Sequence, residues 1–271
     1  MFVLPNLFTV SSIFCGFYAL TLCTGEAGPS QLYQAGLSIF FGIFFDGFDG
    51  RVARLTKTQS QFGMELDSLA DVVTFGAAPA VLVWKWALQP LGFAGLFIGF
   101  AFAACGALRL ARFNVLAQRN PHGGGSSFFV GLPIPLAAGV VISMVLAWHG
   151  ADGGVLPESA RWPVAGAVLF LALLMVSTVR YRTFKDLKLS KKSVAVFVVV
   201  LVGGIVIATQ VHPSGVLVAY FMVYLVAGLL ESAFLLGRRL REGRATAALE
   251  SMDEDEQEGD ETPDVDEQEV L

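Results

Sequence analysis

Long apolar runs separated by short polar connections follow one another along most of the chain. A helix that crosses a hydrocarbon core about 30 Å thick needs about 20 predominantly apolar residues. Runs of this length predict an all-α integral membrane protein, a bundle of about eight transmembrane helices. The predicted crossings are residues 3–23, 31–54, 66–87, 91–117, 131–149, 161–180, 194–210 and 215–236.

The composition supports this class and excludes an ordinary soluble domain. Of the 271 residues, 55% are hydrophobic and 15% are charged, whereas soluble domains have about 25% charged residues. Cys15, Cys23 and Cys105 lie within apolar runs and form no CxxC pair, so we expect neither a disulfide framework nor a cysteine metal site. No basic region precedes the first run, so we expect that run to be retained rather than cleaved as a signal peptide.

The distribution of basic residues predicts how the helices are oriented. Sixteen of the 18 Lys and Arg residues fall at the C-terminal ends of the second, fourth, sixth and eighth runs or in the segments that follow them. Cytoplasmic loops collect Lys and Arg, so we expect a multi-pass protein of the cell (inner) membrane with both termini in the cytoplasm. Trp84, Trp86 and Trp162 lie near the opposite helix ends, as in an interfacial aromatic belt.

The net charge of −5 describes the end of the chain rather than its apolar part. Residues 250–271 contain 12 of the 23 acidic residues and neither Lys nor Arg. We predict a transmembrane domain at 1–237, a basic juxtamembrane segment at 238–249 along the anionic leaflet, and a disordered acidic tail at 250–271. An electrostatic contact with a basic surface is the alternative role of the tail, and no nucleic-acid partner is expected.

Four aspartates form the candidate chemical site. Asp46 and Asp49 are spaced i, i+3 at the end of the second predicted helix, and Asp67 and Asp71 are spaced i, i+4 in the third. Each pair therefore projects from one face of its helix. Because a short cytoplasmic loop joins these two helices, they are antiparallel neighbours, and the two faces can meet at a site that opens to the cytoplasm.

Carboxylates gathered in this way need a balancing charge. Two unit charges about 4 Å apart repel by on the order of 4 kcal/mol at an effective dielectric constant near 20. Either protons or divalent cations must therefore neutralise the site. A set of oxygen ligands alone suits Mg, Mn or Ca rather than zinc, and two such ions can clamp a diphosphate during an in-line displacement.

Small and basic residues beside the aspartates suit a phosphate ligand. Gly50 and Ala53 leave one strip of the helix surface without large side chains. Arg54 can make a forked contact to a phosphate, and Lys57 and Ser60 lie in the following loop, within reach of the same anion. The alternative is that the small residues only pack helices, as they often do in membranes.

The complete spacing is more specific than any single residue. From Asp46 to Asp71 the chain matches D-x2-D-G-x2-A-R-x8-G-x3-D-x3-D at every fixed position, with Gly63 as the glycine before the third aspartate. This pattern resembles the signature of the CDP-alcohol phosphotransferase family. The resemblance implies a cytoplasm-facing active site in which a nucleotide-activated phospholipid gives its phosphatidyl group to an alcohol, with release of CMP.

The resemblance also implies roles for single residues, with Mg or Mn as the metal. Asp46, Asp49 and Asp67 correspond to ligands of one divalent ion. Asp46, Asp67 and Asp71 correspond to ligands of a second ion, and Asp71 also corresponds to the base for the acceptor hydroxyl. The residues expected to contact the CDP-lipid, including two from the opening PNLFTV segment, are Asn6, Thr9, Gly50, Ala53, Arg54, Lys57, Ser60 and Gly63.

More of the chain resembles one branch of this family, the membrane-bound phosphatidylserine synthases of bacteria and archaea. The segments that carry the resemblance are FGMELDSLADVVTFGAAPA from Phe62, LRLARFNV from Leu108, FVGLPIPLAAG from Phe129 and STVRYRTFKDL from Ser177. This branch implies CDP-diacylglycerol and L-serine as substrates and a homodimer. Another acceptor, glycerol phosphate or inositol phosphate, is the alternative.

Arg109 and Arg112 are the candidate serine-binding residues. They are spaced i, i+3 at the cytoplasmic end of the fourth predicted helix, and a carboxylate such as that of serine suits an arginine fork. Cytoplasmic topology or contact with lipid headgroups explains them equally well. Glu65 lies outside the signature and is expected to pair with a nearby Arg, while Asn114 receives no role.

A cation transporter is the alternative from a different functional class, because carboxylates within membrane helices also line ion pathways. Such a pathway requires acidic residues at the middle of the bilayer. The four aspartates instead lie at helix ends beside a basic loop, which favours the enzyme.

Overall fold

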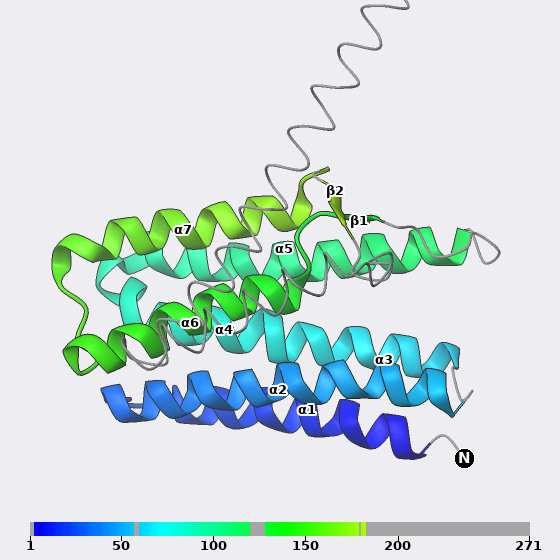
Figure 1. Cartoon of the computed structure of the whole chain (residues 1–271). Helices are drawn as coiled ribbons and strands as arrows, with labels where there is room; N and C mark the ends of the chain where they lie inside the picture. The colour runs from blue at the N-terminus through cyan, green and yellow to red at the C-terminus, as the bar shows by residue number, and fades with distance from the viewer. Residues whose placement is uncertain (1–2, 57–59, 120–127, 179, 183–271) are drawn as a thin grey trace, which may run out of the picture. The chain divides into compact units, whose positions relative to one another are not determined.

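The computed structural model describes residues 3–56, 60–119, 128–178 and 180–182 (Figure 1). All of them belong to one compact unit, Met1–Gly228. The crossings expected at 194–210 and 215–236, the basic segment 238–249 and the acidic tail 250–271 lie outside the described residues.

Six apolar helical stretches coincide with the first six predicted crossings, each within five residues of the expected bounds. The third stretch is continuous but changes its helix type along its length. The elements are α1 (Val3–Leu22), α2 (Pro29–Leu55), α3 (Gln61–Asp71), η1 (Val72–Ala77), α4 (Ala78–Val83), η2 (Trp84–Leu88), η3 (Gln89–Leu91), α5 (Gly92–Arg119), α6 (Ile134–Asp152) and α7 (Glu158–Val176). Figure 1 shows α1 beside α2 and α5 beside α7, and both pairs are in contact.

The third helical stretch begins five residues earlier than predicted because Ser60 caps it. Ser60 has an extended backbone (φ −136°, ψ 154°), and its Oγ accepts a hydrogen bond from the Gly63 N–H at 3.0 Å. Such a cap satisfies one of the N–H groups that the first turn of a helix leaves without a partner. The early start gives Asp67 and Asp71 regular helical positions in α3.

Asp71 ends α3, and a π-helical segment, η1, follows it directly. Segments of this kind inside an α-helical stretch are rare and occur frequently at functional sites. η1 contacts α1, α2, α5 and α6. The change of helix type therefore lies where several described helices meet, immediately after the last signature aspartate.

Three helices pack closely around Thr74 of η1, and we call this contact the Thr74 junction. A Cβ atom added to Gly16 would lie 2.7 Å from Thr74 Cα, and one added to Gly42 would lie 2.6 Å from Thr74 Cγ2. Thr74 Oγ1 donates to the carbonyl of Ser12 (2.9 Å), and Ser12 Oγ donates to the carbonyl of Gly42 (3.2 Å). The glycines allow α1, α2 and η1 to approach closely, and the hydroxyl groups tie them together.

Large apolar side chains lie on the outer surface of the described helices. Phe93 is 80% exposed and Phe100 is 64% exposed. By length and composition, two segments are apolar enough to cross a membrane. They are Gln61–Leu116, which includes the turn before α5, and Glu158–Val176. Lipid-facing helices present such surfaces, so these features agree with a membrane protein.

Two three-residue strands are a local exception to the all-α prediction. β1 (Phe128–Val130) and β2 (Arg180–Arg182) pair antiparallel, with Phe129 opposite Tyr181. Long apolar runs indicate membrane helices, whereas strands of three residues are too short to give a periodic pattern of their own. Phe, Val and Tyr favour extended backbone, so this short pairing is consistent with local preferences.

Candidate functional site

The structure brings the four signature aspartates together where α2 and α3 meet. Carboxylate oxygens of Asp46, Asp49 and Asp67 all lie within 4.8 Å of one another. The carboxyl group of Asp71 lies within hydrogen-bonding distance of that of Asp46. We call these four residues the acid cluster. Two side chains from each helix thus share one site, as the spacing along α2 and α3 indicated.

The acid cluster fits hard divalent cations. Asp49 and Asp71 are 7% and 8% exposed, and buried Oδ1 atoms of Asp67 and Asp71 have no hydrogen-bond partner among the described residues. Buried carboxylate oxygens are normally hydrogen-bonded or bound to metal. Three carboxylates within reach of one ion, with no nitrogen or sulfur ligand in the group, suit Mg, Mn or Ca.

The first helix contributes to the acid cluster through Thr9. Thr9 Oγ1 donates a hydrogen bond to Asp49 Oδ2 at 2.9 Å, and both residues are buried. A hydrogen bond to a charged carboxylate is among the stronger kinds in proteins. Thr9 therefore fixes the orientation of one carboxylate of the cluster from outside the signature.

Asn6, Ser60 and Gly63 form one corner beside the start of α3. A Cβ atom added to Gly63 would lie 3.2 Å from Ser60 Oγ and 3.8 Å from Asn6 Oδ1. The glycine thus leaves room for the serine cap and for the asparagine of α1. Two residues predicted from the opening segment, Asn6 and Thr9, both face the region where α2 and α3 meet.

The α2 surface next to the aspartates is open. A Cβ atom added to Gly47 or Gly50 would meet no described atom within 4 Å. Among the described residues, no neighbouring helix therefore packs on this strip. Ala53 and Arg54 belong to α2, but their side chains, like the whole of Lys57, lie outside the described part of the chain.

The two predicted serine-binding arginines have different surroundings. Arg109 is 9% exposed, lies close enough to Asp71 for the two charges to interact, and holds its guanidinium carbon 5.9 Å from the ring centroid of Phe113. Its buried Nε has no hydrogen-bond partner among the described residues. Arg112 is exposed, and its guanidinium donates to the carbonyl of Val176 at the end of α7 (3.4 Å). Of the pair, Arg109 is the one beside the acid cluster.

Sequence reasoning missed a polar contact between α3 and α5, which we call the Asn114 tie. The Asn114 side-chain amide donates to Ser68 Oγ at 3.0 Å and to Glu65 Oε2 at 3.3 Å. Glu65 and Ser68 are spaced i, i+3, so a shared helix face was visible in the sequence. Nothing in the pattern indicated that α5 would supply their partner.

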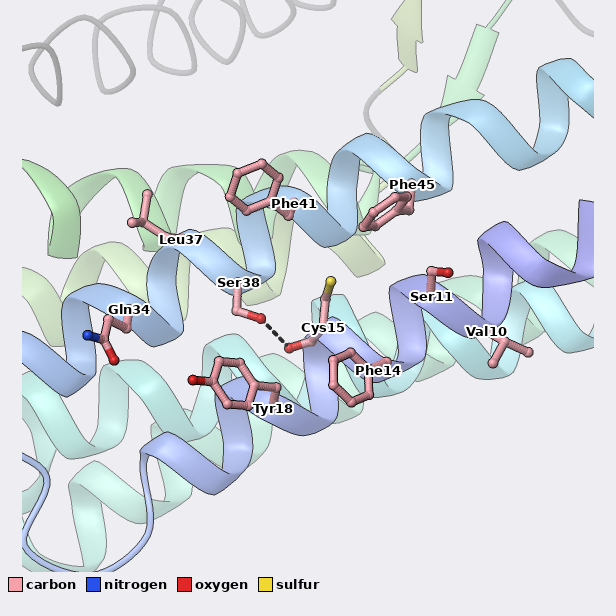
Figure 2. A pocket seen from close by; sticks show the side chains of 10 residues that line it. All are labelled: Val10, Ser11, Phe14, Cys15, Tyr18, Gln34, Leu37, Ser38, Phe41 and Phe45. Carbon is pink, nitrogen blue, oxygen red and sulfur yellow. Dashed lines mark hydrogen bonds between the residues drawn. The ribbon is translucent and has the colours of Figure 1, made fainter.

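An apolar groove with a volume of about 750 Å³ runs between α1 and α2 (Figure 2). Ser38 Oγ donates to the carbonyl of Cys15 at 2.8 Å and so satisfies a polar group in its wall. Phe45, which lines the groove, immediately precedes Asp46 of the acid cluster in α2. The lining residues are Val10, Ser11, Phe14, Cys15, Tyr18, Gln34, Leu37, Ser38, Phe41 and Phe45.

Comparison with known proteins gives matches that include the whole signature. The profile of the CDP-alcohol phosphatidyltransferase family matches residues 2–179. CDP-diacylglycerol–serine O-phosphatidyltransferase of Helicobacter pylori (strain J99) is 36% identical over 240 residues, which cover 87% of this chain and 93% of the relative.

Two further relatives come from other organisms. The protein of the same name from Bacillus subtilis (strain 168) is 33% identical over 184 residues, 67% of this chain and 91% of the relative. Archaetidylserine synthase of Methanothermobacter thermautotrophicus is 33% identical over 180 residues, 66% of this chain and 69% of the relative.

Proposed function

Because the chain belongs to the CDP-alcohol phosphatidyltransferase family, we propose that it transfers the phosphatidyl group of CDP-diacylglycerol to the hydroxyl of L-serine. The products are phosphatidylserine and CMP. The acid cluster carries this proposal, because its carboxylates gather at one point as metal-assisted phosphoryl chemistry requires. The names of all three relatives include serine, which supports serine over glycerol phosphate or inositol phosphate as the acceptor.

We propose that the acid cluster holds two divalent ions, Mg or Mn, with Ca as a possible occupant. Asp46, Asp49 and Asp67 are the ligands of one ion, and Asp46, Asp67 and Asp71 are those of the other. Such ions neutralise the diphosphate and the negative charge that develops on the attacking and leaving oxygens. Oδ1 of Asp67 and Oδ1 of Asp71 support this assignment, because both are buried without a described hydrogen-bond partner.

Asp71 is the proposed general base. It accepts the proton of the serine hydroxyl while the serine oxygen bonds to the phosphorus that carries diacylglycerol. The bond between that phosphorus and the oxygen of CMP breaks, and CMP leaves. A carboxylate within hydrogen-bonding reach of a hydroxyl can perform this proton transfer. No Ser or His occupies a fixed position of the signature, so we favour direct displacement over a covalent phosphatidyl-enzyme.

The CDP-lipid is proposed to lie against α1, α2 and the start of α3. The open surface at Gly50 supports a close approach of the nucleotide diphosphate. The groove between α1 and α2 supports a lipid substrate, since its lining is mainly apolar and includes Phe45, the residue before Asp46. The proposed contacts are Asn6, Thr9, Gly50, Ala53, Arg54, Lys57, Ser60 and Gly63.

Arg109 and Arg112 are the proposed partners of the serine carboxylate. Arg109 has the stronger support, because its charge lies beside Asp71 and its Nε has no described partner. Arg112 donates to a backbone carbonyl at the end of α7 and would have to turn from it to reach the substrate.

The proposed assembly is a homodimer in the cell (inner) membrane. Eight crossings would place both termini and the active site on the cytoplasmic side, which the basic connections support. The transmembrane domain would extend over 1–237, followed by the basic segment 238–249 along the leaflet and the disordered acidic tail 250–271.

The test uses the purified full-length protein in detergent with CDP-diacylglycerol and Mg or Mn. CMP release is compared for L-serine, glycerol 3-phosphate and inositol phosphate. We expect release and phosphatidylserine formation with serine. Release with another alcohol only would contradict the acceptor, and cation flux without any CMP release would favour the transporter. Labelled lipid bound covalently to the denatured protein would overturn direct displacement.

A further inference from the structure

Phe113 lies beside Arg109, one helical turn further along α5. The guanidinium carbon of Arg109 is 5.9 Å from the centroid of the Phe113 ring, inside the limit of about 6 Å for a cation–π attraction. We propose that Phe113 is a positioning residue, which holds the Arg109 guanidinium beside the acid cluster so that it can bind the carboxylate of the acceptor. The inference rests on the proposed function and adds a residue that the sequence did not predict.

Two described groups attract the guanidinium of Arg109. Asp71 is close enough for its charge to interact with that of Arg109, and the Phe113 ring lies on the same helix as the arginine. An ion pair with Asp71 alone would tie the position of the guanidinium to a residue that the proposed mechanism uses as a base. Because the ring supplies a separate attraction, the guanidinium keeps its place while Asp71 takes part in the reaction.

An aromatic ring holds an arginine without taking its hydrogen-bond donors. The attraction acts between the cation and the ring quadrupole, whereas the N–H groups of a guanidinium serve oxygen acceptors. Arg109 Nε is buried and has no hydrogen-bond partner among the described residues. Arg112 differs, because its guanidinium donates to the carbonyl of Val176. Arg109 is therefore held in place with a donor still to satisfy, which suits the binding of a carboxylate.

The residues on both sides of Phe113 fix the end of α5 on which it lies. Arg112 donates to the carbonyl of Val176 at the end of α7 (3.4 Å), and Asn114 donates to Ser68 Oγ of α3 (3.0 Å). The backbone at Phe113 is thus tied to α3, the helix that carries Asp71. A supporting group can orient a binding residue only when it is itself fixed, and these two contacts meet that condition.

Contact with lipid is the alternative role of Phe113. Phe113 is 48% exposed, and Phe100 of the same helix is 64% exposed. A lipid contact requires only an apolar surface, so leucine would replace phenylalanine without loss. A cation–π contact requires a ring, so leucine would fail and tyrosine would serve. The two roles therefore predict different results for the same pair of substitutions.

The experiment measures steady-state kinetics of the purified full-length protein. We expect Phe113→Leu to raise the KM for L-serine about 3- to 30-fold, the effect of losing a cation–π contact. The kcat, the KM for CDP-diacylglycerol and the Mn requirement should not change. Inhibition by 3-hydroxypropionate, which is serine without its amino group, should weaken by the same factor because this compound retains the carboxylate. Phe113→Tyr should keep the wild-type KM, and so should the matched control, Phe100→Leu on the same helix.

A second measurement tests whether Phe113 acts through Arg109. Arg109→Gln removes the positive charge and should raise the KM for serine, and Phe113→Leu added to it should raise that KM no further.

Four results would overturn the inference. They are a further rise in the double variant, a wild-type KM for serine in Phe113→Leu, equal changes in Phe113→Leu and Phe100→Leu, and a higher Mn requirement in Phe113→Leu, which would indicate a structural role only. Failure of the proposed function has a separate signature, because the wild-type protein would then release CMP with glycerol 3-phosphate or inositol phosphate and not with serine.

Discussion

The acid cluster and the Thr74 junction lie three residues apart along one helical stretch, yet their polar groups differ in whether they have hydrogen-bond partners. In the Thr74 junction, the Thr74 and Ser12 hydroxyl groups each donate to a backbone carbonyl. In the acid cluster, Oδ1 of Asp67 and Oδ1 of Asp71 are buried and have no partner among the described residues. The first region satisfies its own polar groups, whereas the second leaves buried carboxylate oxygens without a described partner.

On the proposed function, this difference separates a part of the molecule that stabilises the fold from the part that would perform the chemistry. A satisfied buried hydrogen bond contributes about 1 kcal/mol to stability, whereas a buried polar group without a partner costs about 1–3 kcal/mol. Proteins tolerate such a cost chiefly at functional sites. Substitutions in the acid cluster should therefore reduce activity without reducing stability, and substitutions in the Thr74 junction should do the reverse.

The largest expected effect is that of Asp71→Asn. The amide cannot accept the proton of the serine hydroxyl, so turnover should fall about 10²- to 10⁴-fold, the usual contribution of a general base. In the absence of added divalent metal, thermal stability should not fall, because the substitution removes one of the crowded carboxyl groups of the acid cluster. CMP release measures turnover, and thermal unfolding in detergent measures stability. Binding of CDP-diacylglycerol shows whether the substrate site is retained. Full activity with retained binding would remove Asp71 from the role of base.

Divalent metal should stabilise the protein through the acid cluster. A ligand that binds only the folded state at 100 times its dissociation constant contributes about 2.7 kcal/mol, so Mg or Mn should raise the melting temperature and EDTA should reverse the rise. Asp67→Asn removes a proposed ligand and should abolish the rise, while the Thr74 junction remains intact. An unchanged metal response in Asp67→Asn would show that the ions stabilise the protein at another site.

The sequence was sufficient to predict features that depend on local spacing. Apolar runs of membrane length predicted six helical stretches within five residues, because lipid thickness fixes how long such a helix must be. The spacing of Asp46 and Asp49, and of Asp67 and Asp71, predicted two polar faces, and the short loop between the helices brought them together. Helix geometry and one short connection determine this part of the site.

Features that depend on distant contacts could not be predicted in this way. The Thr74 hydroxyl meets the Ser12 carbonyl across 62 positions of the chain, and the Asn114 tie spans 46 positions to Ser68. Arg109 and Arg112 looked equivalent in the sequence, although packing buries the first beside the acid cluster and directs the second to α7. The π-helical segment after Asp71 has no recognisable signal in its residue pattern.

The Thr74 junction should be sensitive to added volume. In Gly42→Val, the new side chain would collide with Thr74, since even a Cβ atom would lie 2.6 Å from Thr74 Cγ2. Overpacking of this kind lowers the free energy of unfolding by about 1–3 kcal/mol. Gly166→Val on α7, where an added Cβ meets nothing within 4 Å, is the matched control. Thermal unfolding of both variants measures the difference, and equal losses would refute the close packing of the junction.

Thr9→Val should produce the smallest effect, because the contact of Thr9 with the acid cluster is a hydrogen bond to Asp49 rather than a direct part in the proposed chemistry. Valine preserves the shape of the side chain but removes the hydroxyl that donates to Asp49 Oδ2 at 2.9 Å. Loss of a partner that orients a metal-binding carboxylate weakens metal affinity at least about tenfold. The Mn concentration for half-maximal CMP release should therefore rise by about that factor, while Thr9→Ser should retain the wild-type value. If Thr9→Val raised the KM for CDP-diacylglycerol and left the Mn dependence unchanged, Thr9 would act through its proposed lipid contact alone, and its hydrogen bond to Asp49 would not support metal binding.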